Sequence, residues 1–302
     1  MKMAAQLLFH IGKGGVGKST PSAITAVHLA RNSLDCLLVS MDPAHNQRDI
    51  FQRDFSEKPR PVAKHLTVKE VDVAYWIANY LKETEKTIQR TYSYESAFNL
   101  QNYFNVLQFS PGLEEHAMLL AFENIIHTQG DRDVIIFDMA PTALTLRFFS
   151  LPFITLIWLQ ELLKLREKIY AKKEIISKIK IGRRTIEQDK VKVKLGTMIQ
   201  TYGHLRDCFK SDAAQINLVL NNDRLSLAEA LRIKNKLNDI GINIESVLVN
   251  KSQTNVVPAE VKDIFSHQKI ALFPFSSENI VGYEAIRHYL DENGDIFVQT
   301  PR

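Results

Sequence analysis

The chain has 302 residues, of which 45% are hydrophobic and 24% charged, a composition typical of a globular protein with a substantial core. Its net charge of +4 is too small to indicate a nucleic-acid partner. The two cysteines, Cys36 and Cys208, are far apart and form no C-x-x-C pair, which excludes a disulfide framework and a cysteine-based zinc site. We therefore expect a cytoplasmic protein.

Residues 12–20 read Gly-Lys-Gly-Gly-Val-Gly-Lys-Ser-Thr, between a predicted strand at 7–11 and a predicted helix. They match G-x-x-x-x-G-K-[ST], a loop that holds nucleotide phosphates. Glycines let backbone N–H groups converge on phosphate oxygens, while the lysine neutralises the phosphates and the serine hydroxyl ligates Mg²⁺. The predicted nucleotide contacts are Gly12, Lys13, Gly14, Gly15, Val16, Gly17, Lys18, Ser19 and Thr20, with Ser19 also a metal ligand.

Further apolar runs alternate with helical stretches along the chain. Continuous Val/Ile/Leu runs separated by helices predict an α/β fold, a doubly wound and mostly parallel sheet with helices on both faces. Functional loops then lie at the carboxyl ends of the strands. The predicted strands after 7–11 are 36–41, 66–71, 134–138, 216–221, 246–250 and 270–273.

Two aspartates follow predicted strands. Asp42 comes after the run 36–41, and Asp138 closes the run 134–138. A carboxylate beside a phosphate loop can help to hold Mg²⁺ or orient the attacking water. We predict Asp42 as a catalytic residue and both aspartates as metal-site residues. With the glycine-rich loop they indicate a nucleotide hydrolysis site.

Residues 148–210 contain no convincing strand and predict an inserted helical subdomain within one ATPase domain, 1–302. The apolar line Trp158–Leu162–Leu165–Ile169 is expected as the seam of a helical hairpin, with a break near 181–184. Residues 160–194 carry a net charge of +7, either a solvated face or a docking surface.

Three apolar side chains, Leu159, Leu163 and Tyr170, lie off that predicted seam. They either line an open groove for a hydrophobic helix or are buried within the monomer. The apolar stretch 148–159 is interrupted by polar residues and a proline, and it is shorter than the roughly 20 residues of a membrane span. We therefore expect no transmembrane segment.

The loop contains Lys13 in addition to Lys18, the lysine that the general pattern requires, and this extra lysine is a family feature. The pattern K-G-G-V-G-K-[ST] resembles the deviant Walker A of dimeric ATPases, which include ParA, MinD, nitrogenase iron protein and the arsenite-pump ATPase. The stretch Asp42-Pro-Ala-His-Asn is similar to switch I of the arsenite-pump and guided-entry tail-anchored-protein-targeting ATPases. Asp138-Met-Ala-Pro-Thr and Arg147 are similar to their switch II, and Ser110-Pro-Gly-Leu-Glu-Glu to a further motif.

This resemblance implies a homodimer in which Lys13 reaches the partner's nucleotide and acts catalytically. It implies nucleotide contacts from Asp223, an adenine-reading Asn250, and a loop over the base at Phe273 and Pro274. The residues favour ATP independently, because Gln253 stands where related GTPases carry the aspartate that binds guanine.

Three departures from this family bear on function. Ala143-Leu144 replaces the glycine-histidine of its switch II, clustered cysteines for a metalloid are missing, and the chain holds one ATPase unit, not two in tandem. Metalloid stimulation is therefore disfavoured.

Three hypotheses remain open. The first is an Mg²⁺-dependent ATPase whose dimer opens and closes to control binding of a hydrophobic client. The second is an ATPase that energises or regulates a membrane anion transporter. The third is a ParA-like partition ATPase on DNA, which the chain resembles only around the phosphate loop. The partner is therefore a hydrophobic helical client or a membrane protein in the first two hypotheses.

Overall fold

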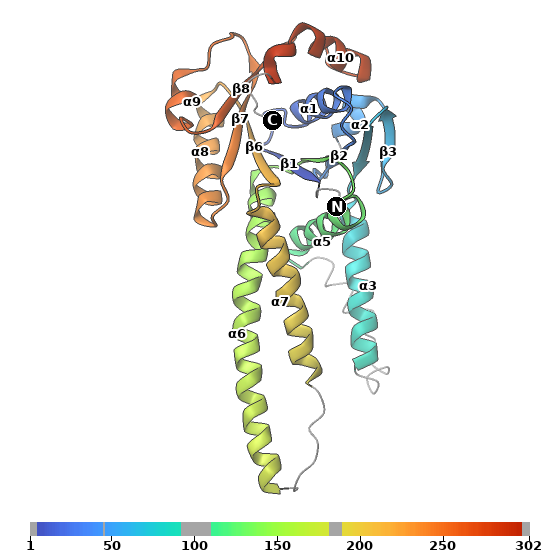
Figure 1. Ribbon diagram of the computed structural model, residues 1–302, viewed down its shortest axis with the longest axis vertical. Coiled ribbons are helices and arrows are strands. Elements are labelled where there is room, and N and C mark those ends of the chain that lie inside the picture. The colour runs from blue at the N-terminus through green and yellow to red at the C-terminus, as the bar shows by residue number, and fades with distance from the viewer. Residues whose placement is uncertain (1–4, 45, 92–109, 181–188, 298–302) are drawn as a thin grey trace. The chain divides into compact units, whose positions relative to one another are not determined.

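The structure is a computed structural model that describes residues 5–44, 46–91, 110–180 and 189–297 (Figure 1). One eight-stranded sheet has the order β3-β4-β2-β5-β1-β6-β7-β8. All neighbouring strands in it are parallel except β3 and β4. The predicted α/β fold is confirmed. The strands are β1 (Gln6–Ile11), β2 (Cys36–Ser40), β3 (Arg60–Ala63), β4 (Leu66–Glu70), β5 (Val134–Asp138), β6 (Ala214–Asn221), β7 (Ile244–Ser252) and β8 (Lys269–Pro274).

Each apolar run predicted as a strand corresponds to one strand of the sheet. The additional strand β3, which the sequence did not predict, is short, lies at the edge and pairs antiparallel with β4. Pro61 suits this position, because an edge strand tolerates a residue that lacks a backbone N–H group.

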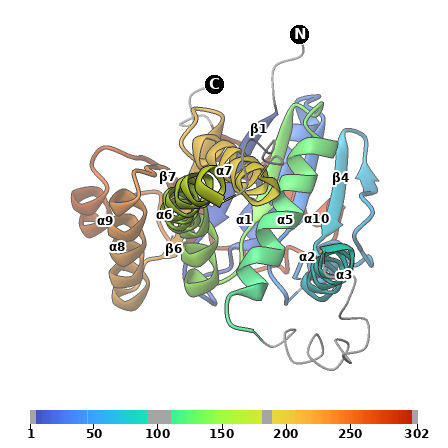
Figure 2. The same ribbon diagram turned by 90° about the horizontal axis from the view of Figure 1, so that it is seen from below.

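Side chains alternate along β1 and β5 between two apolar layers. Leu8 and Ile136 belong to a core cluster that also contains residues of α1 and α10. Phe9 and Phe137 stack at 4.9 Å and contact Phe122 of α5. Helices therefore cover both faces of the sheet, as Figure 2 shows from below. The helices are α1 (Ser19–Arg31), α2 (Asn46–Phe51), α3 (Val73–Thr91), α5 (Leu113–Thr128), α6 (Thr142–Lys180), α7 (Lys190–Phe209), α8 (Arg224–Asp239), α9 (Ala259–Ile264), α10 (Tyr283–Glu292) and the 3₁₀ helix η1 (Gly294–Phe297).

The chain divides into two compact units. The first contains 1–148 and 212–302 with the whole sheet, and the second contains 149–211, which is most of α6 together with α7. Within the second unit α6 and α7 run side by side (Figure 1). The rings of Phe149 and Phe209 lie 5.0 Å apart, and Arg166 binds Asp189 with two hydrogen bonds of 2.8 and 3.0 Å.

The same Asp189 caps the N-terminus of α7, where it accepts hydrogen bonds from the backbone N–H groups of Val191 and Lys192. The Arg166 guanidinium holds the pKa of Asp189 below its usual range. One carboxylate thus begins α7 and joins it to α6. The break predicted at 181–184 lies outside the described residues.

The predicted seam of α6 is wrong. Trp158 is 66% exposed, and Leu162, Leu165 and Ile169 are exposed as well, whereas Leu159 is buried. Leu163 and Tyr170 are half-buried. Both sets repeat at helical spacing, so the period alone does not decide which set faces inward; packing decides it.

The proline expected to interrupt the apolar stretch does not end the helix, since α6 continues through Pro152. As a result, the described residues contain one helical segment, Thr142–Ala171, that is long and apolar enough to cross a membrane. The length argument made from the sequence therefore fails. Length and composition alone do not make it a span, because core helices of soluble proteins meet the same criteria.

Candidate functional site

The glycine-rich loop follows β1 and leads into α1, as the pattern requires. Gly15 and Gly17 have φ values of +82° and +81°, which favour glycine. A Cβ atom at Gly12 would lie 2.3 Å from the carbonyl oxygen of Val219, and one at Gly17 would lie 2.7 Å from Nδ2 of Asn250. A side chain at Gly12 would therefore displace the backbone of β6, and one at Gly17 would displace the Asn250 side chain.

Lys18 stands at the start of α1 and is buried. Its Nζ donates a 3.4 Å hydrogen bond to the carbonyl oxygen of Lys13, so the amine lies back across the loop. Burial lowers the pKa of Lys18, while the charges of Asp138 and Asp42 oppose that effect. Lys13 itself is half-buried. The loop therefore places one cation inside the site and a second at its border.

The two predicted carboxylates both lie beside this loop. Asp42 is buried, and its Oδ1 accepts a 3.0 Å hydrogen bond from the backbone N–H of Ala44. Asp138 is fully buried, and burial raises its pKa to about 6, against the hydrogen bonds it accepts from Gln47 and Ser19. His45 of the predicted switch I lies outside the described residues.

The donor set fits Mg²⁺ bound together with a nucleotide. Ser19 supplies a hydroxyl group, and Asp42 and Asp138 supply hard oxygen atoms next to the loop. The described residues contain no cluster of three or more His, Cys, Asp or Glu that could hold a metal alone. Mg²⁺ commonly uses one or two protein oxygens, phosphate oxygens and waters instead of a complete protein cage.

A pocket of about 310 Å³ opens at the ends of β6 and β7, and two of the predicted nucleotide contacts, Asp223 and Asn250, line it. Nδ2 of Asn250 donates to the carbonyl oxygens of Val16 at 2.8 Å and Gly17 at 3.4 Å. Asp223 is exposed and caps α8 through the N–H of Ser226 at 2.8 Å. Asn250 therefore ties β7 to the phosphate loop. The pocket is lined by Asn221, Asn222, Asp223, Asn250, Lys251, Ser252, Gln253, Thr254 and Pro258.

The predicted base-covering residues do not line that pocket. Phe273 is fully buried in the core cluster with α1 and α10, and the carbonyl oxygen of Pro274 accepts a 2.9 Å hydrogen bond from Tyr289. The next residue, Phe275, is 60% exposed, and its N–H donates to the carbonyl oxygen of Ser252. The difference follows from where β8 ends. Phe273 lies within the strand and faces the core, whereas Phe275 follows Pro274, the last residue of the strand.

Two motifs that are distant in sequence meet at an ion pair. Nη1 of Arg147, in the predicted switch II, lies 3.0 Å from Oε1 of Glu115 on α5. Glu115 is buried and Arg147 is exposed. The start of α6 is thereby attached to α5 within the first unit.

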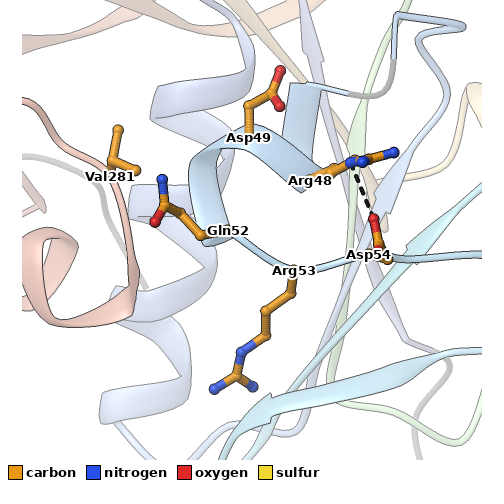
Figure 3. A pocket seen from close by; sticks show the side chains of 6 residues that line it. All are labelled: Arg48, Asp49, Gln52, Arg53, Asp54 and Val281. Carbon is orange, nitrogen blue, oxygen red and sulfur yellow. Dashed lines mark ion pairs between the residues drawn. The ribbon is translucent and has the colours of Figure 1, made fainter.

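Sequence reasoning missed Gln47, which hydrogen-bonds Asp138 from α2. A single glutamine on a six-residue helix carries no motif, so no signal in the sequence identified it. The outer side of α2 lines a pocket of about 420 Å³, where Arg48 and Asp54 point toward one another and form a 3.0 Å ion pair (Figure 3).

A second group of buried polar side chains lies between α1 and the strands β1, β6 and β7. His10 of β1 and Thr25 of α1 line a cavity of about 640 Å³. Both ring nitrogens of His10 and the Thr25 hydroxyl are buried without a hydrogen-bond partner in the described part of the chain. Burial lowers the pKa of His10 to about 3, so this imidazole is neutral at physiological pH.

Comparisons with known proteins agree with this geometry. The family model for anion-transporting ATPases matches residues 5–292. A relative in Aquifex aeolicus named "Putative arsenical pump-driving ATPase 2" is 27% identical over 307 residues, covering 94% of this chain and 97% of that relative. An "ATPase ASNA1 homolog" of Entamoeba dispar is 30% identical over 247 residues, covering 80% of this chain and 74% of its own length.

Proposed function

Because the chain belongs to the anion-transporting ATPase family and is an ATPase, we propose that ATP binding and hydrolysis control its capture of a hydrophobic helical client. In this proposal the protein is a cytoplasmic homodimer that uses Mg²⁺ and opens and closes with its nucleotide. The client surface is the predicted helical subdomain, 148–210.

The observation that carries the proposal is an apolar stripe on α6. The members of this α6 stripe are exposed and recur at helical spacing: Ile154, Ile157, Trp158, Leu162, Leu165 and Ile169. Contiguous exposed apolar residues are uncommon on a protein without a binding partner. A helix that presents apolar residues at this spacing complements a second amphipathic or transmembrane helix.

The charge around the stripe adds to this argument. Residues 160–194 carry twelve Lys/Arg and five Asp/Glu, a net charge of +7. Some lysines pair locally, as Lys164 does with Glu161 and Lys192 with Glu167. The surplus positive charge would favour an anionic membrane surface, where a hydrophobic client is delivered.

The nucleotide chemistry is assigned to residues of the first unit. We assign Lys18 to the phosphate charge, Asp42 to the orientation of the attacking water, and Ser19 with Asp138 to the metal site. Mg²⁺, when bound, supplies charge neutralisation at the phosphates. Lys13 acts in trans, because a second cation at the loop border suits the charge of the partner's nucleotide.

The test replaces Trp158, Leu162 and Leu165 together with serine. We expect ATP turnover to stay within about twofold of the parent, while capture of a model hydrophobic helix falls at least about tenfold. The matched control replaces Glu161, Lys164 and Lys168 of the same helix with serine. Unchanged capture by the folded apolar-to-serine variant would refute the assignment of the α6 stripe.

One observation favours the second hypothesis. The family description names anion transport, and the Aquifex relative is named as pump-driving. An ATPase that energises a transporter would dock on a membrane protein instead of an extracted helix. The same variants separate the two, because loss of transporter stimulation with unchanged helix capture would favour the pump-coupled function.

A further inference from the structure

Gln47 is the second residue of α2, the short helix that follows Asp42 and the predicted switch I loop. Its side chain is 0% exposed, although glutamine is usually found at protein surfaces. Phe51, one turn later, is buried on the same side. The buried amide must therefore find partners inside the nucleotide site.

The amide nitrogen joins two parts of that site. Nε2 of Gln47 donates to Oδ2 of Asp138 at 2.9 Å and to the backbone carbonyl oxygen of Ser19 at 3.1 Å. Both partners are acceptors, so only a side chain with two N–H donors satisfies them together. A carboxylate at this position would have no proton for either bond and would place a like charge beside Asp138.

The other end of the amide is an unused acceptor. Oε1 of Gln47 is buried and has no hydrogen-bond partner in the described ranges. A buried carbonyl oxygen without a donor costs free energy, so such an atom points to a donor that arrives with a ligand. Here the neighbouring groups are the hydroxyl-bearing Ser19 and the carboxylate of Asp138, which form the proposed metal site. Water molecules around a cation are hydrogen-bond donors.

We propose that Gln47 is a positioning residue of the metal site. Its amide nitrogen orients Asp138 and, through the Ser19 carbonyl oxygen, holds α2 against the start of α1. Its Oε1 accepts a hydrogen bond from the hydration shell of Mg²⁺. This inference rests on the proposed Mg²⁺-dependent function. It makes α2, and with it the switch I loop, sensitive to whether the metal site is filled.

The experiment measures ADP binding by calorimetry across a Mg²⁺ titration, which needs no hydrolysis. Gln47→Leu and Gln47→Met remove the two N–H donors and the acceptor oxygen, and Gln47→Met keeps the length of the side chain. We expect both to raise the Mg²⁺ concentration at half-effect by about 10- to 100-fold, the usual cost of losing an outer-shell partner. ADP affinity without metal should stay within about twofold, because Gln47 acts through the metal site.

Asp49→Asn is the matched control, because Asp49 is exposed on the outer side of the same helix (Figure 3). It should leave the Mg²⁺ dependence unchanged. Circular dichroism verifies that each variant is folded. If Gln47→Leu does not fold, the comparison rests on Gln47→Met.

The inference is overturned if a folded Gln47 variant keeps the parental Mg²⁺ dependence. It is also overturned if the variants weaken ADP binding equally with and without Mg²⁺, which would indicate a structural role alone. Failure of the parental protein to bind Mg²⁺ and ADP together would instead contradict the proposed function. The outcomes of the two ideas are thus distinguishable.

Discussion

The nucleotide site buries polar side chains, whereas the helical unit exposes apolar ones. Around the phosphate loop, polar and charged side chains such as Lys18, Asp138 and Gln47 are buried. Gln47 donates a hydrogen bond to Asp138, and Lys18 donates one to the loop backbone. On α6, large apolar side chains such as Trp158 and Leu165 are exposed. The first region is organised by its own contacts, whereas the second leaves apolar surface that a partner would cover. This contrast underlies the proposal that the first region carries out ATP chemistry and the second binds a client.

The largest expected effect that separates the regions is on catalysis. Asp42→Asn removes the negative charge proposed to orient the attacking water, so turnover should fall by roughly 10²- to 10⁴-fold. The variant should still bind ATP, and its α6 stripe should still bind a hydrophobic helix. Steady-state phosphate release measures the effect. A turnover rate within about threefold of the parent would exclude this role for Asp42.

Loss of the buried cation should come next. Lys18→Ala removes the amine that neutralises the phosphates, and we expect affinity for ATP with Mg²⁺ to fall at least about 100-fold. Lys164→Ala on α6 is the control, since that lysine is exposed and pairs with Glu161. Isothermal titration would contradict the prediction if Lys18→Ala kept parental affinity.

A smaller effect on ATP turnover tests whether the nucleotide site needs Lys13 from a second subunit. Parental protein mixed with an equal amount of Lys13→Ala subunits should show less activity than the sum of the two alone, because mixed dimers lose one trans lysine. Strictly additive activity, or full activity of a monomer at every concentration, would show that Lys13 does not act across an interface.

The smallest effect concerns the cavity below α1. His10→Leu replaces two unpartnered nitrogens with an apolar side chain, and the free energy of unfolding should rise by about 1 kcal/mol. Chemical denaturation at pH 7.5 measures it, with His288→Leu at the exposed surface of α10 as the control. A large loss of stability would indicate that His10 has a partner.

The same variant tests a pH dependence. The pKa of His10 is about 3 when folded and 6.5 in its reference state, so the unfolded chain binds a proton that the folded chain does not. Stability should therefore fall as pH falls from 6.5, by up to about 1.4 kcal/mol per unit from this group. This pH dependence should be absent in His10→Leu. If the unfolding free energy of the variant fell with pH as steeply as that of the parent, His10 would not be its source.

The different physical origins of the two regions also explain what the sequence could predict. The phosphate loop is a local pattern, since glycine spacing and the flanking strand and helix lie within one stretch of chain. The parallel strands were likewise visible as continuous apolar runs. Asp42 and Asp138 could be placed because each follows one of those runs.

Contacts between distant segments were not predictable in this way. The inward face of α6 depends on what packs against it, and both of its apolar lines have the same period. Gln47 reaches Asp138 across 91 positions of sequence, with no pattern to mark either partner for the other. The predicted base-covering residues show the same limit, because β8 ends at Pro274: Phe273 is buried within the strand, whereas Phe275, just past it, is exposed.

The most direct test of the central claim is capture of a fluorescent hydrophobic helix by the parental protein with ATP, with ADP and without nucleotide, alongside the serine-substituted α6 stripe. We predict that capture by the parent changes at least about tenfold between nucleotide states. The stripe variant should show low capture in every state. Capture that is equal in all three states, or equal in parent and variant, would contradict the account.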